Sequence, residues 1–395
     1  MRPRTVSTTI ENAADELPVP LVDLGIQHRR MSHQILDQMA QVMETTSFVL
    51  GPQVAAFEQA YATFCEVPHC IGVGNGTDAI ELALRAAGIG FGDEVIIPAN
   101  TFVATAEAVV RAGARLVLAD CDENYLLDVA SVADKLTDRT RAVIGVDLYG
   151  QVAKFEEIAS VVGDSVAIIE DAAQSHGASR WGQAAGSLGI AASTSFYPGK
   201  NLGAYGDAGA VMTHDIQLAD RVRELRNHGG QRRYEHVVLG TNSRLDSIQA
   251  AVLAVKLSEL PAWNRERELA AQRYTDLLAD TDEVVLPRVL DGNRHVWHLY
   301  VVRVADRDRV LAELESRGIR AGIHYPRPIH QLPAYADMCK SGGLSNSERF
   351  AQEILSLPIF PGITVAQQDR VVDSLRAALG ATSRRQDTLS GSSES

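Results

Sequence analysis

Residues 166–174 of this 395-residue chain read VAIIEDAAQ. The four apolar residues form a continuous run, which is typical of a strand buried on both faces, and the carboxylates of Glu170 and Asp171 follow it directly. In open α/β sheets, ligands bind beyond the carboxyl ends of the strands, so these carboxylates are expected at a binding site. A carboxylate there can hold the protonated ring nitrogen of a cofactor, bind a metal, or cap the next helix.

Similar short apolar runs alternate with helical patterns over about residues 70–215. The other runs lie at residues 70–73, 94–98, 115–119, 142–146, 193–197 and 210–213. Helix-period segments between them lie at residues 78–87, 104–112 and 155–162. This alternation predicts the α/β fold class, with a mostly parallel sheet covered by helices.

Beyond residue 215 the pattern becomes helical, at residues 218–226 and 245–260, until Pro261 interrupts it. A smaller α+β pattern follows, with helices at 266–278, 308–317, 346–355 and 366–379 and strands at 298–304 and 319–324. We therefore expect a flexible N-terminal arm (1–17), a large α/β domain (18–260), a small C-terminal domain (261–381) and a disordered tail (382–395).

The composition narrows the classes of partner. The chain carries a net charge of −13, which argues against nucleic acid and anionic membranes because both are recognised by clustered basic side chains. Residues 1–17 lack the apolar core of a signal peptide, and no later run reaches the ~18 apolar residues of a membrane span. The four cysteines fit neither a CxxC pair nor a zinc site, so we expect reduced thiols, no metal and a cytoplasmic location.

Residues 74–78, GNGTD, follow a predicted strand and open a predicted helix. Backbone N–H groups at a helix N-terminus favour an anion, and Thr77 can add a hydroxyl donor. The spacing departs from the GxGxxG dinucleotide fingerprint, because the third glycine is missing. The turn is therefore either a phosphate site or an ordinary helix cap.

Only five of the 37 basic residues are lysines: Lys135, Lys154, Lys200, Lys256 and Lys340. Lys200 follows the predicted strand at 193–197 and precedes a glycine-rich segment. A Walker A motif is excluded by Thr194 and Asn201, which stand where that motif needs glycine and Ser/Thr. Lysine forms Schiff bases, and its pKa falls readily on desolvation. The other four lysines lie in helical or loop contexts that are typical of solvated surface.

The Gly-Thr turn, Asp171 and Lys200 occur in this order along the chain. Together they supply the three requirements of a pyridoxal phosphate (PLP) site: a phosphate anchor, a partner for the ring nitrogen and an imine-forming amine. Each feature is a weak signal alone, whereas the ordered set predicts PLP as the cofactor.

Five motifs resemble those of the DegT/DnrJ/EryC1/StrS sugar aminotransferases, which are fold-type I PLP enzymes. They are GTDA (76–79), PANTFVAT (98–105), EDAAQ (170–174), SFYPGK (195–200) and GTNSRLD (240–246). The resemblance extends over about residues 19–379. It implies a PLP-dependent aminotransferase that forms an obligate homodimer with shared active sites.

The resemblance also implies roles for individual residues. Lys200 would form the Schiff base and shuttle protons, and Asp171 would pair with the pyridine nitrogen. Gln174 would hydrogen-bond the cofactor's phenolic oxygen, and Phe102 would stack on its ring. The phosphate would be held by Gly76, Thr77, Ser195 and, from the neighbouring subunit, Asn242.

One branch of the family acts on nucleotide-linked 3-keto-6-deoxyhexoses, and four strings resemble that branch. They are FYPGKNLG (196–203), QRRYEH (231–236), VWHL (296–299) and HYP (324–326). Many members that act on 4-keto sugars have His where this chain has Tyr197. The resemblance places Tyr197, Tyr234, His236 and His324 nearest the nucleotide sugar, although His324 also fits a buried strand end under Pro326.

The implied reaction moves an amino group from glutamate to the 3-keto carbon of a sugar carried on a nucleotide, with dTDP as the expected carrier. The alternatives are a 4-keto-sugar aminotransferase, a PLP-dependent sugar dehydratase, a PLP-binding regulator and a nicotinamide enzyme. Related dehydratases lack the imine lysine, and the intact set of Lys200, Asp171 and Gln174 argues against a regulator without catalysis. The missing glycine argues against the nicotinamide enzyme.

Overall fold

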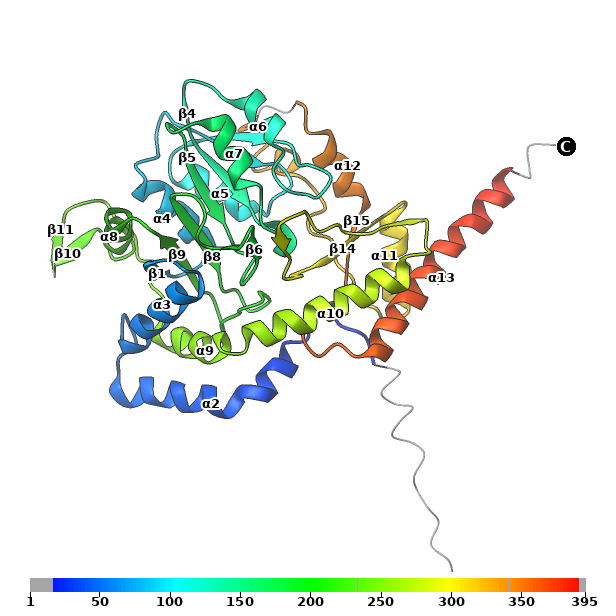
Figure 1. Cartoon of the computed structure of the whole chain (residues 1–395), viewed down its shortest axis with the longest axis horizontal. Coiled ribbons are helices and arrows are strands. Elements are labelled where there is room, and N and C mark those ends of the chain that lie inside the picture. Colours follow the sequence, from blue (N-terminus) through cyan, green and yellow to red (C-terminus); the bar gives the residue numbers. More distant parts are fainter. Residues whose placement is uncertain (1–16, 233, 340–341, 391–395) are drawn as a thin grey trace, which may run out of the picture.

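The computed structural model describes residues 17–232, 234–339 and 342–390, and a seven-stranded sheet lies at its centre (Figure 1). The strand order is β1-β9-β8-β5-β4-β2-β3, and within this sheet only β9 runs antiparallel to its neighbours. The strands are β1 His69–Val73, β2 Glu94–Pro98, β3 Arg115–Ala119, β4 Thr140–Val146, β5 Ala167–Asp171, β8 Ala191–Ser195 and β9 Gly209–Thr213. The predicted α/β class with a mostly parallel sheet is confirmed.

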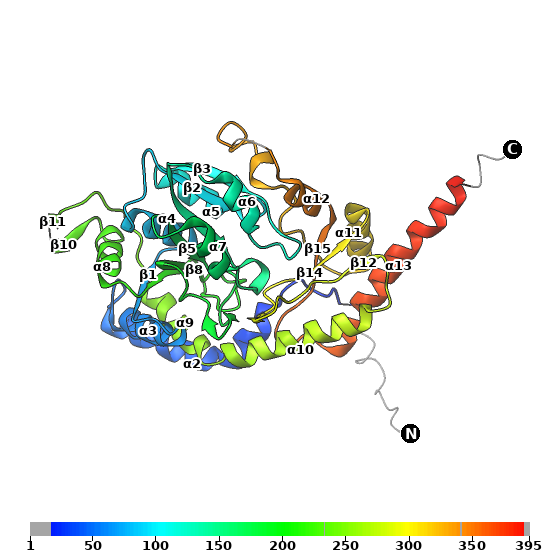
Figure 2. The same cartoon turned by 45° about the horizontal axis from the view of Figure 1, so that its top comes forward.

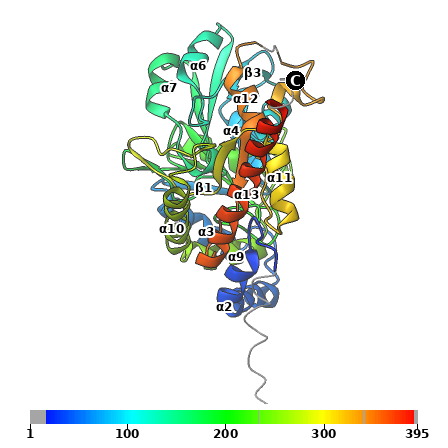
Figure 3. The same cartoon turned by 90° about the vertical axis from the view of Figure 1, so that its right-hand side faces the viewer.

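Helices cover both faces of this sheet, and alternate strand residues point to the two layers. Val95 and Ile97 pack toward α4, α5 and α8, whereas Ile96 packs toward α6 and α7. Over β1, β8 and β9 that second face is covered by α3 and α9. The helices are α3 Pro52–Phe64, α4 Gly76–Ala86, α5 Val103–Arg111, α6 Val129–Lys135, α7 Phe155–Val162, α8 Ile216–Leu225 and α9 Ser247–Leu257. Helix α2 (Leu24–Thr45) packs outside α9, at the end of the molecule opposite α6 and α7 (Figure 3).

Strand β5 contains the acidic pair that the sequence placed beyond its end. Glu170 and Asp171 still pair with Gly145 and Val146 of β4, so both carboxylates belong to the last two positions of the strand. Both residues are buried, because the strand is central and helices cover both faces. The sheet therefore places Asp171 at its carboxyl edge with a fixed backbone.

A smaller antiparallel sheet follows, in the order β12-β14-β15. Its strands are β12 Val284–Val285, β14 Tyr300–Val304 and β15 Ile354–Leu357. Helices α11 (Arg307–Ser316) and α13 (Val365–Ser390) pack on it (Figure 2). Leu299, Phe350 and Ile354 also belong to the apolar cluster of the large sheet, so the two sheets share a hydrophobic core.

The start of the described chain packs on the small sheet's layer. Val19 forms a parallel bridge with Ile319, and its N–H donates to the Gly318 carbonyl at 2.8 Å. Val19 and Ile319 are buried in the same apolar cluster. Residues 1–16 of the expected N-terminal arm lie outside the described residues.

Helix α10 (Leu260–Leu278) connects the two regions along one side of the molecule (Figure 1). It begins immediately before Pro261, which occupies its first turn. Proline is tolerated there because the first N–H groups of a helix have no intrahelical partner. The proline therefore starts a helix, and the helix expected only from residue 266 begins at Leu260.

Three C-terminal expectations differ from the structure. Residues 319–324 form isolated bridges, Ile319 to Val19 and Gly322 to Ser356, where a strand was expected. Helix α12 (Ser345–Glu353) ends early because the chain enters β15. Helix α13 continues to Ser390, into the segment from residue 382 that was expected to be a disordered tail. Residues 391–395 lie outside the described part.

Lys256 was expected on the solvated surface, and this expectation is wrong. Its residue is only 4% exposed on α9, and its Nζ donates to the Gly203 carbonyl at 2.6 Å. The ammonium also lies over the Tyr205 ring, 4.4 Å from the ring centroid. Lys256 therefore fastens the loop that follows Lys200 to α9.

The remaining elements are short. Strands β6 (Ser179–Arg180), β7 (Gln183–Ala184) and β13 (Asn293–Arg294) form a small sheet, and β10 (Gly230–Arg232) with β11 (Glu235–His236) forms a hairpin. This hairpin projects at the end of the molecule opposite the last turns of α13 (Figures 1 and 2). Among the described residues, no helix combines the length and the apolar character needed to cross a membrane.

Candidate active site

A cavity of about 560 Å³ opens at the carboxyl ends of β1, β5 and β8. Nine residues proposed from the sequence line it: Gly76, Thr77, Phe102, Asp171, Gln174, Ser195, Tyr197, Lys200 and His324. The parallel strands bring these residues together from segments that are far apart in the chain, as expected at the carboxyl edge of an α/β sheet.

The N-terminus of α4 forms one end of the cavity. Asn75 caps this helix, because its Oδ1 accepts the Asp78 N–H at 2.8 Å. A Cβ on Gly76 would lie 2.5 Å from the Ser195 Cβ, so only glycine lets the helix start approach the end of β8 so closely. Free backbone N–H groups and the hydroxyls of Thr77 and Ser195 then meet at one place, which suits a phosphate.

One residue that the sequence argument missed, Ser243, supports this turn. The Ser243 hydroxyl accepts the Gly74 N–H at 3.0 Å and donates to the Asp78 Oδ2 at 2.7 Å. Ser243 is buried, and its contacts join the segment after β11 to the turn after β1. Its place in the GTNSRLD motif, beside Asn242, was the available signal.

Asp171 lies at the floor of the cavity. Its Oδ2 accepts the Thr105 hydroxyl at 2.9 Å, and its Oδ1 accepts the Ala173 N–H at 3.2 Å. Burial raises the pKa of the Asp171 carboxyl, and these hydrogen bonds together with the nearby Lys200 act in the opposite direction. Thr105, on α5, was part of a quoted motif but was not proposed as a site residue.

Lys200 stands on a tight loop after β8. Its N–H donates to the Tyr197 carbonyl at 2.8 Å, and the Ala204 N–H returns to the Phe196 carbonyl at 2.8 Å. Burial lowers the pKa of Lys200 to about 8, and the carboxylate of Asp171 works against this shift. Near neutral pH the amine is still mostly protonated, but a far larger fraction of it is neutral than in an ordinary lysine, and that fraction can act as a nucleophile or a base.

Gln174 presents its amide nitrogen to the cavity. Its Oε1 accepts the Tyr149 N–H at 2.7 Å, and because that partner can only donate, the orientation of the amide is fixed. Its Nε2 donates to the Tyr325 hydroxyl at 3.2 Å. The cavity-facing side of Gln174 is thus a hydrogen-bond donor, which matches an anionic oxygen.

Aromatic and imidazole groups line the opposite side. The ring centroids of Phe102 and Tyr325 lie 5.2 Å apart, and Phe102 is half exposed. His324 Nδ1 lies 2.8 Å from the Ser356 hydroxyl, and burial lowers the pKa of His324 to about 4, so its imidazole is neutral. Tyr197 is 59% exposed at the cavity.

Three proposed residues lie elsewhere. Tyr234 is 80% exposed, and His236 of β11 is exposed with its Nδ1 2.9 Å from the His228 carbonyl. Asn242 is exposed and forms a bridge with Asn227. None of the three lines the cavity of its own chain.

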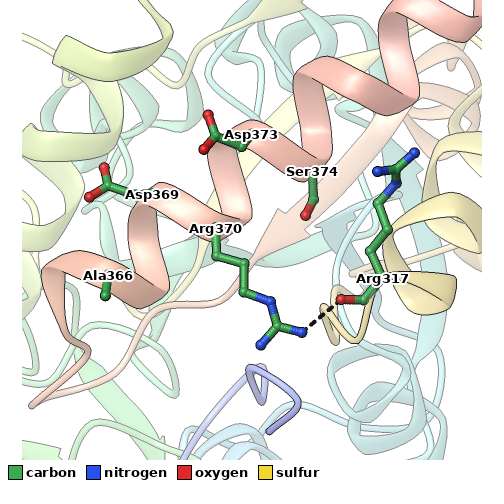
Figure 4. A pocket seen from close by; sticks show the side chains of 6 residues that line it. All are labelled: Arg317, Ala366, Asp369, Arg370, Asp373 and Ser374. Atoms are coloured by element: carbon green, nitrogen blue, oxygen red, sulfur yellow. Dashed lines mark hydrogen bonds between the residues drawn. The ribbon is translucent and has the colours of Figure 1, made fainter. Parts of the chain in front are cut away.

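A second, open pocket of about 500 Å³ lies on the first turns of α13, between Arg317, Ala366, Asp369, Arg370, Asp373 and Ser374 (Figure 4). Arg370 spans it and donates to the Arg317 carbonyl at 2.9 Å. It contains none of the residues proposed from the sequence. Among the described residues, no group of three or more His, Cys, Asp or Glu side chains could hold a metal ion.

Comparison with known proteins gives the family. The model of the DegT/DnrJ/EryC1/StrS aminotransferase family matches residues 29–376. This chain belongs to that family. It is therefore a PLP-dependent aminotransferase, and the family assignment made from the sequence motifs is confirmed.

Relatives and solved structures agree with this assignment. The chain is 44% identical to a pleiotropic regulatory protein of Geobacillus stearothermophilus, over 90% of this chain and 97% of the relative. It is 41% identical to dTDP-3-amino-3,4,6-trideoxy-alpha-D-glucose transaminase of Streptomyces venezuelae, over 93% and 98% of the two chains. The crystal structure of S. venezuelae DesV in complex with a ketimine intermediate has a TM-score of 0.88 and 42% identity, covering 91% and 98%.

The cavity fits PLP on its own geometry. The cradle that a Cβ on Gly76 would fill suits the phosphate, and Asp171 offers a buried carboxylate to a ring nitrogen. Lys200 offers a partly neutral amine to the same space. Anchor, carboxylate and amine thus line a single cavity.

Proposed function

We propose that this aminotransferase moves an amino group from glutamate to carbon 3 of a nucleotide-linked 3-keto-6-deoxyhexose, with dTDP as the nucleotide. The observation that carries the chemistry is the meeting of Lys200, Asp171 and the phosphate turn in one cavity. The similarity to a dTDP-3-amino-sugar transaminase supports the sugar class and the position of the new amine.

The proposed cofactor contacts follow from the positions of the side chains. Gly76, Thr77 and Ser195 hold the phosphate, and Asp171 holds the protonated ring nitrogen by charge. The Gln174 amide donates to the phenolic oxygen. PLP, when bound, withdraws electrons from the carbon that loses its proton.

Phe102 and Lys200 complete these roles. Phe102 stacks on the ring from the open side of the cavity, where Tyr325 is its present neighbour. Lys200 holds the cofactor at rest and, once released, takes the α-proton from the amino donor at its Nζ. The lowered pKa suits this step, because a base works best when its pKa lies near the working pH.

We also propose a homodimer in which Asn242, Tyr234 and His236 serve the partner's cavity. All three are exposed and lie outside the cavity of their own chain. Leu239, in the same segment, is 88% exposed. Apolar side chains on a projecting hairpin suit burial against a second copy. The unpaired cysteines, three of them buried, support a cytoplasmic location.

The function is tested by offering glutamate with dTDP-3-keto- and dTDP-4-keto-6-deoxyhexoses and locating the new amine by NMR. We expect yellow protein, cofactor fixed to Lys200 by borohydride, and an amine at carbon 3. Amination at carbon 4 alone would refute the proposed sugar class, and protein that stays colourless with PLP would refute the proposed cofactor contacts.

A regulatory role is the second candidate, because a relative at 44% identity carries a regulatory name. The lowered pKa of Lys200 beside Asp171 favours catalysis, since binding alone needs no proton shuttle. Turnover of any keto sugar with glutamate separates the two roles.

A further inference from the structure

The cavity has two ends with different surroundings. Asp171, Lys200 and the turn at Gly76 define the cofactor end, at the strand termini. Another part of the wall comes from the start of the described chain, where Leu21 and Val22 line the cavity together with His324 and Tyr325. This second end is the space left for a sugar once the first is filled, an argument that rests on the proposed function.

Leu21 is held in place by backbone hydrogen bonds. Its carbonyl accepts the Ile359 N–H at 3.2 Å, and two residues earlier the Val19 carbonyl accepts the Arg320 N–H at 2.9 Å. Immediately after Val22, Asp23 caps α2 by accepting the Gly25 N–H at 2.8 Å. The segment is therefore fixed on both sides of the two apolar side chains, and it forms a rigid part of the wall.

Leu21 borders the same spot as His324. A Cβ on Gly322 would lie 3.0 Å from the His324 Cε1 and 3.1 Å from the Leu21 Cδ2. The His324 Nδ1 is engaged by the Ser356 hydroxyl, so its Nε2 is the nitrogen left for a ligand. A polar group and an apolar group thus adjoin each other at the sugar end.

The charged side chains that line the cavity also indicate that its sugar end is apolar. Among the described lining residues, these are Asp171, Asp207 and Lys200, and no arginine is present. Neither Leu21 nor Val22 can offer a side-chain hydrogen bond, so a hydroxyl or carboxylate placed against them would lose its water without replacement.

We propose that Leu21 and Val22 are specificity-determining residues that receive a deoxygenated carbon of the sugar and disfavour an oxygen there. A methyl or methylene group gains contact with the two side chains, whereas a hydroxyl pays for its desolvation. An apolar pocket of this kind discriminates by about 10- to 100-fold.

The test uses the reverse reaction, from dTDP-3-amino sugars and 2-oxoglutarate. The sugars are the 3-amino-3-deoxy, 3-amino-3,6-dideoxy and 3-amino-3,4,6-trideoxy glucose derivatives, which share one nucleotide and differ only in hydroxyls. We expect the unmodified enzyme to have a higher kcat/KM for a deoxygenated sugar than for its hydroxylated counterpart. The isosteric Val22→Thr variant and Leu21→Ser should each narrow that ratio by about tenfold.

Leu24→Ser is the matched control, because Leu24 is exposed on α2 and does not line the cavity. Its ratios should equal those of the unmodified enzyme, and cofactor absorbance should be the same in all variants. If Leu21→Ser fails to bind PLP, Val22→Thr decides, since it changes no volume. Unchanged ratios overturn the inference, whereas an unmodified enzyme that turns over none of the sugars overturns the proposed function instead.

Discussion

The cavity at the strand ends and the β10–β11 hairpin carry two parts of the proposed site in opposite surroundings. Asp171 and Gln174 are each 5% exposed and are held by hydrogen bonds within their own chain. Tyr234 is 80% exposed, and Asn242 is exposed with no place in that cavity. The cofactor end is thus organised within one chain, and the exposure of the hairpin side is what the proposed homodimer requires.

Among the changes to the cavity at the strand ends, the loss of Lys200 has the largest expected effect on kcat. Lys200→Ala should lower kcat by about a millionfold, as the loss of a residue that is both nucleophile and base does. Product formation from the keto sugar and glutamate measures the effect. Lys135→Ala is the control, since Lys135 lies on α6 and does not line the cavity, and it should keep full activity. Retained turnover in Lys200→Ala would contradict the assigned role.

Asp171→Asn should give the next largest effect. The amide keeps the shape of the side chain but loses the negative charge that stabilises a protonated ring nitrogen. We expect kcat to fall by about 100- to 1,000-fold, as when one preorganised electrostatic partner is removed. Cofactor absorbance shows whether PLP remains bound. A variant with normal kcat would show that the buried carboxylate has no electrostatic role.

Asn242→Ala tests whether the exposed Asn242 serves the cavity of the partner chain. Losing a hydrogen bond to a charged phosphate should weaken PLP binding by about 10- to 100-fold, measured by titration of the apoenzyme. If the sites are shared, each mixed dimer of Asn242→Ala with Lys200→Ala contains one intact site. Random mixing should then restore about a quarter of native activity at limiting PLP. No gain on mixing would place Asn242 in its own chain's site.

The smallest effect concerns pH. Because imine formation needs the neutral amine, PLP uptake by the apoenzyme should rise with pH and level off above about 8, the value to which burial lowers the pKa of Lys200. An ordinary lysine would keep gaining reactivity up to about 10.4. Nα-acetyl-lysine in the same buffers corrects for the titration of PLP itself.

Asp171→Asn sharpens the pH test. The Asp171 carboxylate raises the pKa of Lys200 toward its ordinary value, so its removal should move the midpoint of PLP uptake to lower pH. A midpoint that stays in place would show that the two groups are not electrostatically coupled.

The sequence predicted the sheet well because continuously apolar runs such as residues 94–98 and 115–119 have few alternatives to buried strands. The sequence prediction failed where only hydrogen-bond pairing with a distant segment decides whether residues form a strand. Residues 319–324 are apolar enough for a strand but pair only at Ile319 and Gly322, while β15 was hidden behind the helical pattern of α12.

In the site, too, the sequence predicted positions that follow from strand topology and missed contacts made by distant segments. Asp171 and Lys200 follow recognisable strands, so their meeting could be inferred from topology. Thr105 hydrogen-bonds Asp171, and Ser243 hydrogen-bonds Gly74, in each case across a long stretch of sequence. Nothing in the sequence around Thr105 or Ser243 predicts these hydrogen bonds. Lys256 looked like a surface lysine because helical periodicity does not show which neighbour covers a face.

The pairing of Val19 with Ile319 joins residues that are 300 positions apart. On the ribosome, at roughly 5 to 20 residues per second, Val19 waits about 15 to 60 seconds for its partner. The strands from His69 to Thr213 are complete well before then. Val19 and Leu21 can therefore reach their backbone partners only after the strands of the large sheet have been synthesised, once residues 318–322 and 359 emerge.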